Sequence, residues 1–523
     1  MSNRANIFES VKTMRVKKTI FDLSHNNLLT CNMGELVPCL CMEVLPGDTF
    51  RVRGTCITKF QPLVAPIMHN IDAYIHYFYV PNRLLWSRWE DFITGGADGT
   101  LEPSFPRINI KEALAVGDGR LADYLGFPVL QDKMDFLEDA TLEVSALPFK
   151  AYCKIWNDFF RDQNLEEEID LSVNEEGLQD ENDWYILRKR AWQKDYFTSA
   201  LPWAQRGPEV TIPIGTTAPV EGLFRATHID GSSPSGNVSM NGNYMVDGTN
   251  HQLQSASNPT GLYANLEGAT GITLNALRQL ERLQTWLEAN ARGGARYVEQ
   301  ILMHFAEFVP DARLQRAEFL GAGRFPVSVS EVLQTSNNSE DGTSQSSLGS
   351  VGSRYGHAMA IGSANFTKHF VEHGFIIGIY SVRPQTSYFQ GMQKYWRRFD
   401  KLDYAWPEFA HLGEQEVKQW EIFTTNVGGS LDESTFGYQS RYAEYKYLPD
   451  SVHGDFVSNL QYWHLARKFN TPPHLNSTFI HSEPRKDIFA VTDEKEQALL
   501  VQFHFSIKAI RCLPKFGTPM LGH

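Results

Sequence analysis

The string His369-Phe370-Val371-Glu372-His373 has the residue types and spacing of an H-x-x-E-H zinc-protease motif. That chemistry requires both imidazole rings on one face of a helix, about one turn apart, so that they bind a single ion. Here the string runs directly into Gly374 and the apolar run FIIGIYSV, which is typical of a β-strand. Residues four apart on a strand are separated by ~13 Å, because each residue adds ~3.3 Å. We therefore predict that this string binds no zinc.

Cysteine is the second residue type that could hold a metal. The chain has six Cys, and four of them lie in one apolar, strand-like region: Cys31, Cys39, Cys41 and Cys56. The spacing Cys39-Leu40-Cys41 is not C-x2-C, and no second pair follows at zinc-finger spacing. We interpret these cysteines as small buried hydrophobic side chains.

Signatures of other enzyme chemistry are missing from the sequence. It contains no G-x-S-x-G elbow, no G-x-x-x-x-G-K-[ST] loop and no strand-linked G-x-G-x-x-G. Residues 138–183 hold 14 acids against three bases, but a glycosidase pair is defined by its separation in space, which a sequence does not show. The residues therefore predict no catalytic site, no bound metal and no cofactor.

The elements that would position these residues are mostly strands. Three runs rich in Val, Ile, Tyr and Phe lie within residues 36–81, separated by Pro and Gly, and similar runs occur at 375–382 and 498–510. The run at 71–81 is apolar on both faces, which predicts a strand buried on both sides. The run at 498–510 alternates apolar and polar residues, which predicts one exposed face. Strands at both ends of the chain indicate one sheet system that closes late.

Helical patterns lie between these strands. Residues 148–163 and 184–197 have a helical, aromatic character, and residues 272–308 have the clearest helical periodicity. In that last stretch leucines recur at three- and four-residue spacing until Gly293-Gly294 interrupts them, which predicts two helices or one broken helix. We interpret the leucine stripe as core.

Residues 212–271 differ from the rest in composition. Of these 60 residues 31 are Gly, Ser, Thr, Asn or Pro, so the segment cannot build a core of its own. Turn dipeptides such as Asp230-Gly231, Asn241-Gly242 and Asp247-Gly248 separate short runs around Tyr244. This pattern favours a β-rich surface insertion over a flexible linker. A second polar tract, 336–353, is predicted to be a loop.

Composition and charge restrict the class of protein. The 523 residues are 42% hydrophobic and 12% aromatic, which excludes disorder of the whole chain, and at ~100–200 residues per domain the length alone suggests three or four domains. No apolar run approaches the ~18 residues that a membrane helix needs, and the N-terminus carries no secretory h-region, so we expect no membrane insertion and a cytoplasmic chain.

The net charge of −13 divides into +4 for residues 1–20 and −17 for the remainder. The positive part is a basic N-terminal arm, in which Glu9 is the one acid and the bases are Arg4, Lys12, Arg15, Lys17 and Lys18. Such blocks of like charge are usually solvated tails, and an acidic body repels a polyanion on average. The chain therefore combines a basic N-terminal arm with an acidic remainder.

Several blocks of the sequence together resemble one protein family. They include FDLSHNNLLTCNMGELVPCLCMEVLPGDTF (21–50), FYVPNRLLWSRWEDFITGG (78–96), ALPWAQRGPEV (200–210), LEANARGGARYVEQIL (287–302), DARLQRAEFLG (311–321), HGFIIGIYSVRPQTSYFQG (373–391) and RYAEYKY (441–447). The chain resembles, over essentially its whole length, the major capsid proteins of the Microviridae, small single-stranded DNA bacteriophages, and within them the gokushovirus branch.

The resemblance implies a mainly β fold, an eight-stranded antiparallel viral jelly roll with large loop and helical insertions. Eight strands of about eight residues need only ~64 residues, so most of 1–523 would be connections within a single capsid domain. It further implies a homo-oligomer in which pentamers assemble into a 60-copy T=1 icosahedral shell around a circular single-stranded DNA genome. Residues 212–271 would form a threefold surface protrusion for host attachment, around Gly231, Asn241, Tyr244 and Asp247.

The resemblance also suggests partners and a location. Inner-surface contacts to the nucleic acid are expected from the basic arm and from Lys508, Arg511 and Lys515, because Lys and Arg bind DNA by releasing counterions. A small basic DNA-binding protein should share the neutralisation, and a scaffolding protein and a host cell-surface receptor are further partners. The location would be the virion, assembled in the host bacterial cytoplasm. The alternative from another class is a jelly-roll carbohydrate-binding module or cupin-like enzyme, which would need a compact barrel with few insertions.

Overall fold

The computed structural model describes residues 18–116, 119–128, 142–179, 182–207, 274–293, 296–333, 354–425, 433–491, 493 and 496–516, together with short strands between 220 and 264. These residues divide into two compact units. The first contains the described parts of 1–204 and 293–523, and the second those of 205–292. The sequence stretch 212–271 lies in the second unit, and the predicted loop at 336–353 lies outside the described residues.

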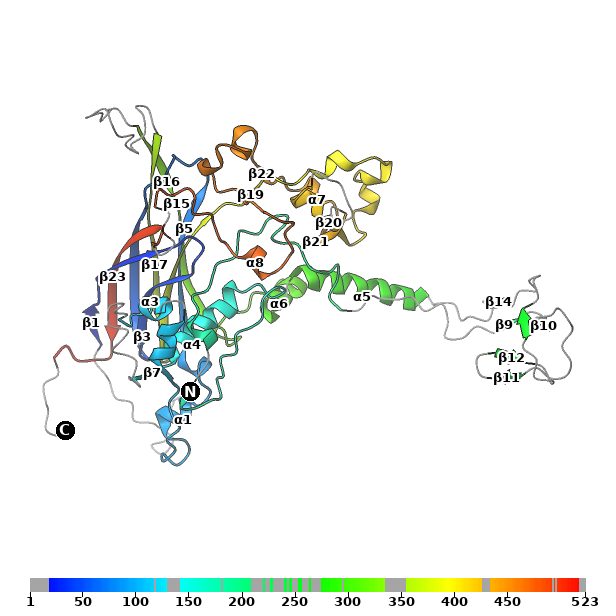
Figure 1. Ribbon diagram of the computed structural model, residues 1–523. Coiled ribbons are helices and arrows are strands. Elements are labelled where there is room, and N and C mark those ends of the chain that lie inside the picture. The colour runs from blue at the N-terminus through cyan, green and yellow to red at the C-terminus, as the bar shows by residue number, and fades with distance from the viewer. Residues whose placement is uncertain are drawn as a thin grey trace, which may run out of the picture. The chain divides into compact units, whose positions relative to one another are not determined.

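Two antiparallel sheets form the centre of the first unit (Figure 1). The first sheet has the strand order β1-β23-β4-β17-β16, with β2 also paired to β23. Its strands are β1 (Thr19–Asp22), β2 (His25–Cys31), β4 (Thr49–Phe60), β16 (Ser328–Leu333), β17 (Arg354–His369) and β23 (Leu499–Arg511). The second sheet has the order β15-β5-β18-β3, and its strands are β3 (Val37–Val44), β5 (Ile71–Pro81), β15 (Glu318–Pro326) and β18 (Gly374–Pro384).

These strands confirm the runs predicted at 36–81, 375–382 and 498–510. Strand β23 pairs with β4 over twelve positions, from Leu499↔Phe60 to Ile510↔Thr49, so the C-terminal strand closes the first sheet. Its residues alternate between buried and exposed, as the alternating sequence predicts. Strand β5 is buried over nearly its whole length, as expected for a strand that is apolar on both faces.

The main hydrophobic core lies between the two sheets. The first sheet contributes Phe503 and Phe505, whose rings stack with centroids 5.5 Å apart, and Tyr380 of the second sheet meets Phe503 edge-on at 5.3 Å. Strand β4 approaches strand β5 so closely that a Cβ atom at Gly54 would lie 2.2 Å from the hydroxyl oxygen of Tyr77. Only glycine fits there, because the aromatic rings opposite already fill the space.

A second core covers the other face of the second sheet. Phe78 and Ile377 point from that face toward helix α4 (Leu147–Ile155), where Tyr152 and Ile155 are buried. Shorter elements complete this layer: α1 (Trp89–Thr94), α2 (Ile110–Ala115), α3 (Arg120–Tyr124), β6 (Arg107–Asn109), β7 (Glu143–Ser145) and β8 (Leu178–Gln179). The second sheet is therefore buried on both faces, whereas the first sheet presents one open face.

A third, smaller core joins residues 196–200 to the segment 388–480. Its elements are short: β19 (Ser387–Tyr388), β20 (Glu414–Lys418), α7 (Gln419–Ile422), β21 (Thr435–Ser440), β22 (Asp450–Ser451) and α8 (Ser477–Ile480). Phe436 and Phe479 meet edge-on in it with centroids 5.1 Å apart. Long connections thus build structure of their own outside the two sheets.

The helical predictions have mixed outcomes. The pattern at 148–163 is confirmed by α4, which continues as a π-helical turn over Trp156–Phe160. The pattern at 272–308 forms two helices, α5 (Leu274–Gly293) and α6 (Tyr297–Phe305), but the interpretation of its leucines as core is wrong for Leu277 and Leu283, which are exposed. The helix predicted at 184–197 is wrong as well. There the backbone of Arg188 and Arg190 is hydrogen-bonded to residues 34–36 of another segment, so its groups are used between segments and not within a helix.

The second unit contains α5 and three pairs of short antiparallel strands. The pairs are β9 (Val220–Glu221) with β14 (Tyr263–Ala264), β10 (Ala226–His228) with β13 (Leu253–Ser255), and β11 (Ser239–Asn241) with β12 (Tyr244–Val246). Asn241 pairs with Tyr244, so β11 and β12 are antiparallel neighbours, while Gly242 of the predicted turn dipeptide Asn241-Gly242 lies outside the described residues.

The stacked phenylalanines give a test of the core. We expect Phe503→Ala to lower the free energy of unfolding by about 3–5 kcal/mol, because it leaves a cavity between the sheets. Gln502→Ala, one residue away on the exposed face of the same strand, should change it by less than about 0.5 kcal/mol. Urea denaturation of the two purified variants measures both. Equal destabilisation would contradict the assignment of the two faces.

Lys150 gives a second test, because its side chain is fully buried beneath the ring of Trp184. Burial lowers its pKa to about 8, although Glu175 and Asp170 act in the opposite direction. The unfolded chain therefore binds more protons than the native state between about pH 8 and 10, and stability due to this group rises with pH in that window.

We expect Lys150→Met to raise the free energy of unfolding at pH 7 by about 1–3 kcal/mol, since the cost of burying a charge disappears. The difference between the variant and the wild type should then shrink from pH 8 to pH 10, as measured by denaturation across that range. A difference that is constant with pH would show that the pKa of Lys150 is the same in the native and the unfolded chain, so that burial does not lower it.

Candidate nucleic-acid interface

The H-x-x-E-H string lies at the turn from β17 to β18, and its side chains have separate partners. The ring of His369 is hydrogen-bonded to Thr49 Oγ1 at 2.9 Å, Glu372 forms an ion pair with Arg83, and the ring of His373 lies edge-on to Trp89. Within the described part of the chain, no three His, Cys, Asp or Glu side chains are placed to hold one metal ion. The string therefore joins two strands and does not form a zinc site.

The cysteines predicted to be small buried side chains have that environment. Cys31, Cys39 and Cys56 are buried and Cys41 is half-buried, and all four are free thiols. Burial raises the pKa of Cys41 and of Cys56 to about 12, so neither is a thiolate at neutral pH.

The predicted DNA-contacting residues fall into three groups. Arg4, Lys12, Arg15 and Lys17 lie outside the described residues. Lys18 and Arg511 are described and engaged in the fold: Lys18 Nζ donates to the carbonyl of Gly47 at 2.9 Å, and Arg511 Nε lies 3.2 Å from the buried carboxylate of Asp48. Lys508 and Lys515 are exposed, and Lys515 lies over the ring of Phe516.

Lys508 belongs to a basic cluster on the open face of the first sheet. In the strand register Lys508 lies opposite Arg51, and Arg51 lies opposite Thr367. One step along the sheet, Ser506 lies opposite Arg53, which lies opposite Asn365. These six residues surround a shallow depression of about 350 Å³. We call Arg51, Arg53 and Lys508 the sheet cluster.

The sheet cluster has little compensating charge. Among the described residues no carboxylate lies within ion-pair distance of Arg51, Arg53 or Lys508. Asp22, opposite Lys508 in the register, keeps a lowered pKa chiefly because Ser24 donates hydrogen bonds to it, and Lys508 adds a smaller effect. Two guanidinium groups and an ammonium group beside hydroxyl and amide side chains can bind phosphate groups.

Arg51 and Arg53 are not among the residues predicted from the sequence to contact DNA, although the sequence carries a signal for them. In TFRVRGTCITKF the buried Phe50 and Val52 alternate with the two arginines, so the arginines had to share the exposed face. What the sequence did not show was that β23 lies beside β4, which brings Lys508 to Arg51 across 457 residues of chain.

The same open face is apolar farther from the sheet cluster. Exposed aliphatic side chains there are Leu28, Ile57, Ile361 and Leu500. Exposed apolar side chains that gather in this way are typical of a surface that becomes covered in an assembly.

Comparisons with known proteins identify the family. The family model described as "Capsid protein (F protein)" matches residues 9–521. The capsid protein VP1 of Chlamydia phage 1 is 34% identical over 604 aligned residues, covering 100% of this chain and 98% of that protein. VP1 of Bdellovibrio phage phiMH2K is 35% identical, covering 98% and 97%, and VP1 of Spiroplasma virus 4 is 30% identical, covering 100% and 98%.

The chain belongs to this capsid protein family. The resemblance to the gokushovirus branch of the Microviridae is confirmed, and the protein is a structural major capsid protein of the virion and not an enzyme. A capsid protein assembles with its own copies into a shell that encloses the genome. In the described parts of the chain, no helix combines the length and apolarity needed to cross a membrane.

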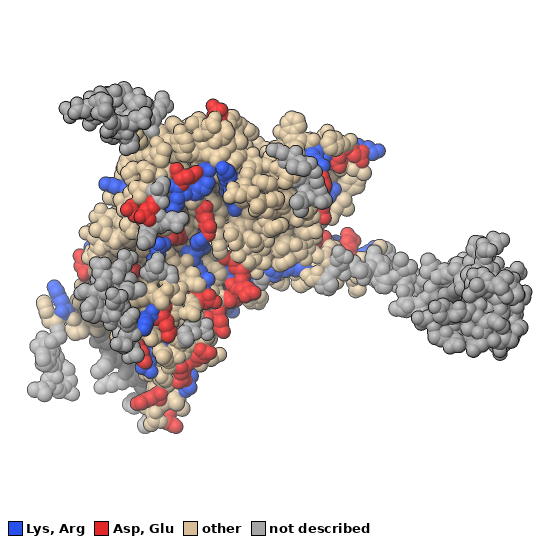
Figure 2. All heavy atoms as spheres, in the orientation of Figure 1, with Lys and Arg blue, Asp and Glu red and all other residues tan. Residues whose placement is uncertain are grey.

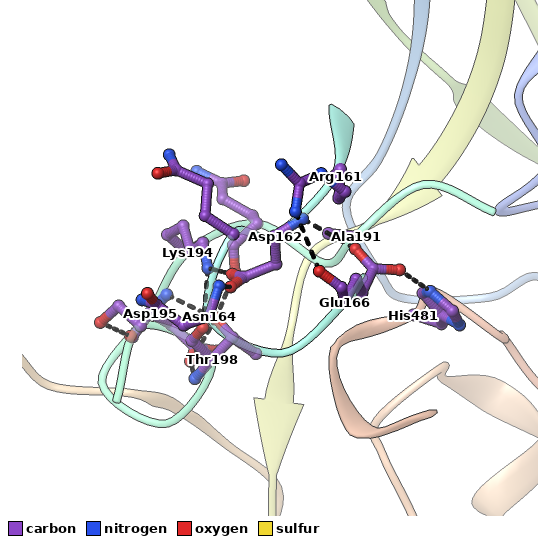
Figure 3. A network of polar contacts seen from close by, with 12 residues as sticks. Arg161, Asp162, Asn164, Glu166, Ala191, Lys194, Asp195, Thr198 and His481 are labelled. Atoms are coloured by element: carbon purple, nitrogen blue, oxygen red, sulfur yellow. Dashed lines mark hydrogen bonds and ion pairs between the residues drawn. The ribbon is translucent and has the colours of Figure 1, made fainter. Parts of the chain in front are cut away.

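Carboxylates of the acidic stretch of the capsid protein form contacts within the fold, as Figure 3 shows for Asp162 and Glu166. One oxygen of Glu166 accepts from the backbone N–H of Asp162 at 2.7 Å, and the other lies 2.5 Å from His481 Nε2. Asp162 also forms an ion pair with Lys194, and Arg161 donates to the carbonyl of Glu166 at 3.0 Å. These carboxylates connect the segment after α4 to Lys194 and His481. Because they are engaged with these partners, they do not form an acid and base pair for catalysis.

Elsewhere the charges of the capsid protein are dispersed. Figure 2 shows acidic and basic side chains intermixed on the face in view. Of the residues predicted for host attachment, Asn241 and Tyr244 lie in the β11–β12 hairpin, and Gly231 and Asp247 lie outside the described residues.

The sheet cluster leads to a binding prediction. We expect the triple variant Arg51→Gln, Arg53→Gln, Lys508→Gln to bind single-stranded DNA at least about tenfold more weakly at 0.1 M salt, because up to three phosphate contacts are lost. The slope of log K against log salt should fall by about 0.7 for each contact. Fluorescence anisotropy of a labelled oligonucleotide across a salt series measures both quantities.

A matched triple variant controls for net charge. Lys401, Lys446 and Lys468 are exposed and lie far from the sheet cluster in the sequence, in segments outside both sheets. Changing these three to Gln removes the same charge. If both triple variants weaken binding equally, the sheet cluster is not the binding surface.

Proposed function

We propose that the protein is the subunit of a T=1 icosahedral shell, in which pentamers of an eight-stranded jelly roll build a 60-copy particle around a circular single-stranded DNA genome. The observation that carries the proposal is the strand order. In chain order β2, β3, β4, β5, β15, β17, β18 and β23 supply four strands to each sheet, in the orders β2-β23-β4-β17 and β3-β18-β5-β15, and β1 and β16 are further strands of the first sheet.

This order supports a jelly roll in detail. The first strand lies beside the last, the second beside the seventh, the third beside the sixth, and the fourth beside the fifth. That nesting is the result of folding one long antiparallel hairpin over itself, which is the double Greek key of viral capsid domains. On this reading residues 1–523 are a single capsid domain, and the stretches between β5 and β15 and between β18 and β23 are insertions.

An exposed aromatic surface supports contacts between copies. We use this name for Tyr395, Trp396, Phe399, Leu402, Tyr404, Trp406, Leu412, Tyr445 and Leu448, all of which are exposed. The two segments that carry it are joined, because the Trp406 and Ala405 N–H groups donate to the Tyr442 and Tyr445 hydroxyls at 3.3 and 3.2 Å. Exposed aromatic and leucine side chains gathered on two joined segments are typical of a protein–protein contact, and a second copy of a self-assembling protein is the expected partner.

Charge supports the proposed contacts with DNA. The arm 1–20 carries +4, and the sheet cluster adds three cations, but the whole chain carries −13. These bases cannot neutralise a genome alone, so a small basic DNA-binding protein would share the work. Aromatic rings on the inner surface would add stacking with the bases that does not depend on sequence.

The remaining partners follow from the same reading. The insertion 212–271 would project at the threefold axes and meet a host cell-surface receptor. A scaffolding protein would guide assembly in the host bacterial cytoplasm. The polar composition of 212–271 supports its place on the outer surface, because it has too few apolar side chains for a subunit contact.

Electron microscopy of the purified chain, alone and with the scaffolding protein of the same genome, tests the shell. We expect uniform icosahedral particles whose mass corresponds to 60 chains. Monomers under every assembly condition, or shells with a different copy number, would contradict the proposal.

The aromatic surface gives a more specific test. Trp396 and Phe399 are 64% and 86% exposed, so the double variant Trp396→Ser, Phe399→Ser should change subunit stability by less than about 1 kcal/mol. We expect it to reduce the yield of shells at least about tenfold, because apolar anchors contribute most of the energy of a contact. Sedimentation velocity measures subunits and shells in one experiment.

The conservative variant Trp396→Phe, Phe399→Leu is the control, since it keeps the apolar area largely unchanged. It should assemble nearly as well as the wild type. Normal assembly of the serine variant would remove the aromatic surface from the contacts between copies.

A further inference from the structure

Three arginines gather around one tyrosine at the start of β5. Tyr74 lies in the second sheet, on the face turned away from the first sheet, because Ala73 and Ile75 on either side of it belong to the core between the sheets. In the register Tyr74 lies opposite Ser381 of β18 and Arg324 of β15. Neighbouring Asp72 lies opposite Arg383.

The guanidinium carbons of Arg190, Arg383 and Arg324 lie 4.0, 5.4 and 5.9 Å from the centre of the Tyr74 ring. Arg190 comes from a different segment and donates to Ser381 Oγ at 2.7 Å. Arg383 in turn donates to the carbonyl of Ala191, next to Arg190, at 2.8 Å. Both guanidinium groups are therefore held in place by hydrogen bonds to neutral oxygens.

The charges in this cluster do not balance. Asp72 forms an ion pair with Arg324 at 2.7 Å. Among the described residues, Arg190 and Arg383 have no carboxylate within ion-pair distance. Both are half-buried, and burial together with the adjacent Arg383 lowers the pKa of Arg190 to about 9. Two partly desolvated cations side by side are unfavourable unless an anion joins them.

His76 adds a second kind of group beside Tyr74, a buried imidazole with an unused hydrogen-bonding atom. Its ring is stacked on Tyr74 at 6.0 Å, and its Nδ1 atom is buried with no hydrogen-bond partner among the described residues. Burial, assisted by Arg190 and Arg383, lowers the pKa of His76 to about 3, so the ring is neutral at pH 7 and can donate one N–H. The hydrogen-bonding capacity of this buried ring atom is therefore available to a ligand.

We propose that Arg190, Arg383 and His76 form a phosphate-binding site on the second sheet, with Tyr74 as its floor and Arg324 at its rim. Guanidinium groups bind phosphate through paired N–H donors, and an imidazole N–H can serve a further oxygen. A carboxylate could compensate the charge, but it has only two oxygens for three donor groups.

The site is separate from the sheet cluster. Tyr74 and the sheet cluster lie on opposite sides of the two-sheet core, and stacked sheets are about 10 Å apart. A DNA strand on the open face of the first sheet would therefore not reach the site directly. The phosphate group could be free inorganic phosphate or a backbone phosphate of another stretch of DNA, and the two sources can be distinguished by experiment.

Isothermal titration calorimetry of the purified wild-type chain with inorganic phosphate tests the site, with sodium chloride of matched ionic strength as the reference. We expect one saturable site per chain. Arg383→Gln and Arg190→Gln should each weaken phosphate binding at least about tenfold, because each removes a charge-assisted donor. Lys401→Gln, which removes the same charge from an exposed position elsewhere, should leave the affinity unchanged.

Further binding measurements identify the source of the phosphate group and exclude other ligands. If Arg383→Gln also weakens the binding of oligodeoxythymidylate without terminal phosphates, the DNA backbone supplies the phosphate. If it weakens only inorganic phosphate, the ligand is free phosphate. Arg383→Lys keeps the charge but loses the paired donors, so it should bind phosphate more weakly than the wild type even if a glutamine variant fails to fold.

Three results would overturn the proposal. They are no saturable heat with the wild type, equal phosphate affinity in the wild type and both Arg383 variants, and binding of acetate or an acidic peptide as tight as that of phosphate.

Discussion

The second sheet is buried on both faces, against the first sheet on one side and against α4 and its neighbouring segments on the other. This double burial requires strands that are apolar throughout, and it explains why β5 and β18 show no alternation. It also fixes the long connection after β5, because α4 must return to cover Phe78 and Ile377.

The first sheet has the opposite character, and function follows from the difference. Its inner face is as apolar as the second sheet, but its outer face keeps arginines, a lysine and scattered aliphatic side chains in solvent. An isolated subunit gains nothing from leaving those cations without partners. In a shell, the proposed contacts with DNA would give these cations partners, and the proposed contacts with other copies would cover the apolar side chains.

The acidic net charge is consistent with this division. Many carboxylates have partners within the subunit. Glu166 is hydrogen-bonded to His481, and Asp162 forms an ion pair with Lys194. Among the described residues, two places where cations gather without an ion pair are the sheet cluster and the pair Arg190 and Arg383 beside Tyr74. Cations without partners in an acidic chain mark the positions where an outside anion fits best.

The sequence by itself determined the strands, the double burial of β5, the alternation of β23 and the family. These depend on local periodicity, on the spacing of residues along one element and on blocks that keep their order along the chain.

Tertiary structure decided which distant segments contact each other, and periodicity along the sequence does not specify those contacts. The segment 184–197 is not helical because its backbone bonds to residues 34–36, and Leu277 and Leu283 are exposed although they recur at helical spacing. Lys508 meets Arg51, and Arg190 meets Tyr74, only because strands and loops far apart in the chain become neighbours. Pairing of distant segments depends on the packing of the whole chain, and no local pattern specifies it.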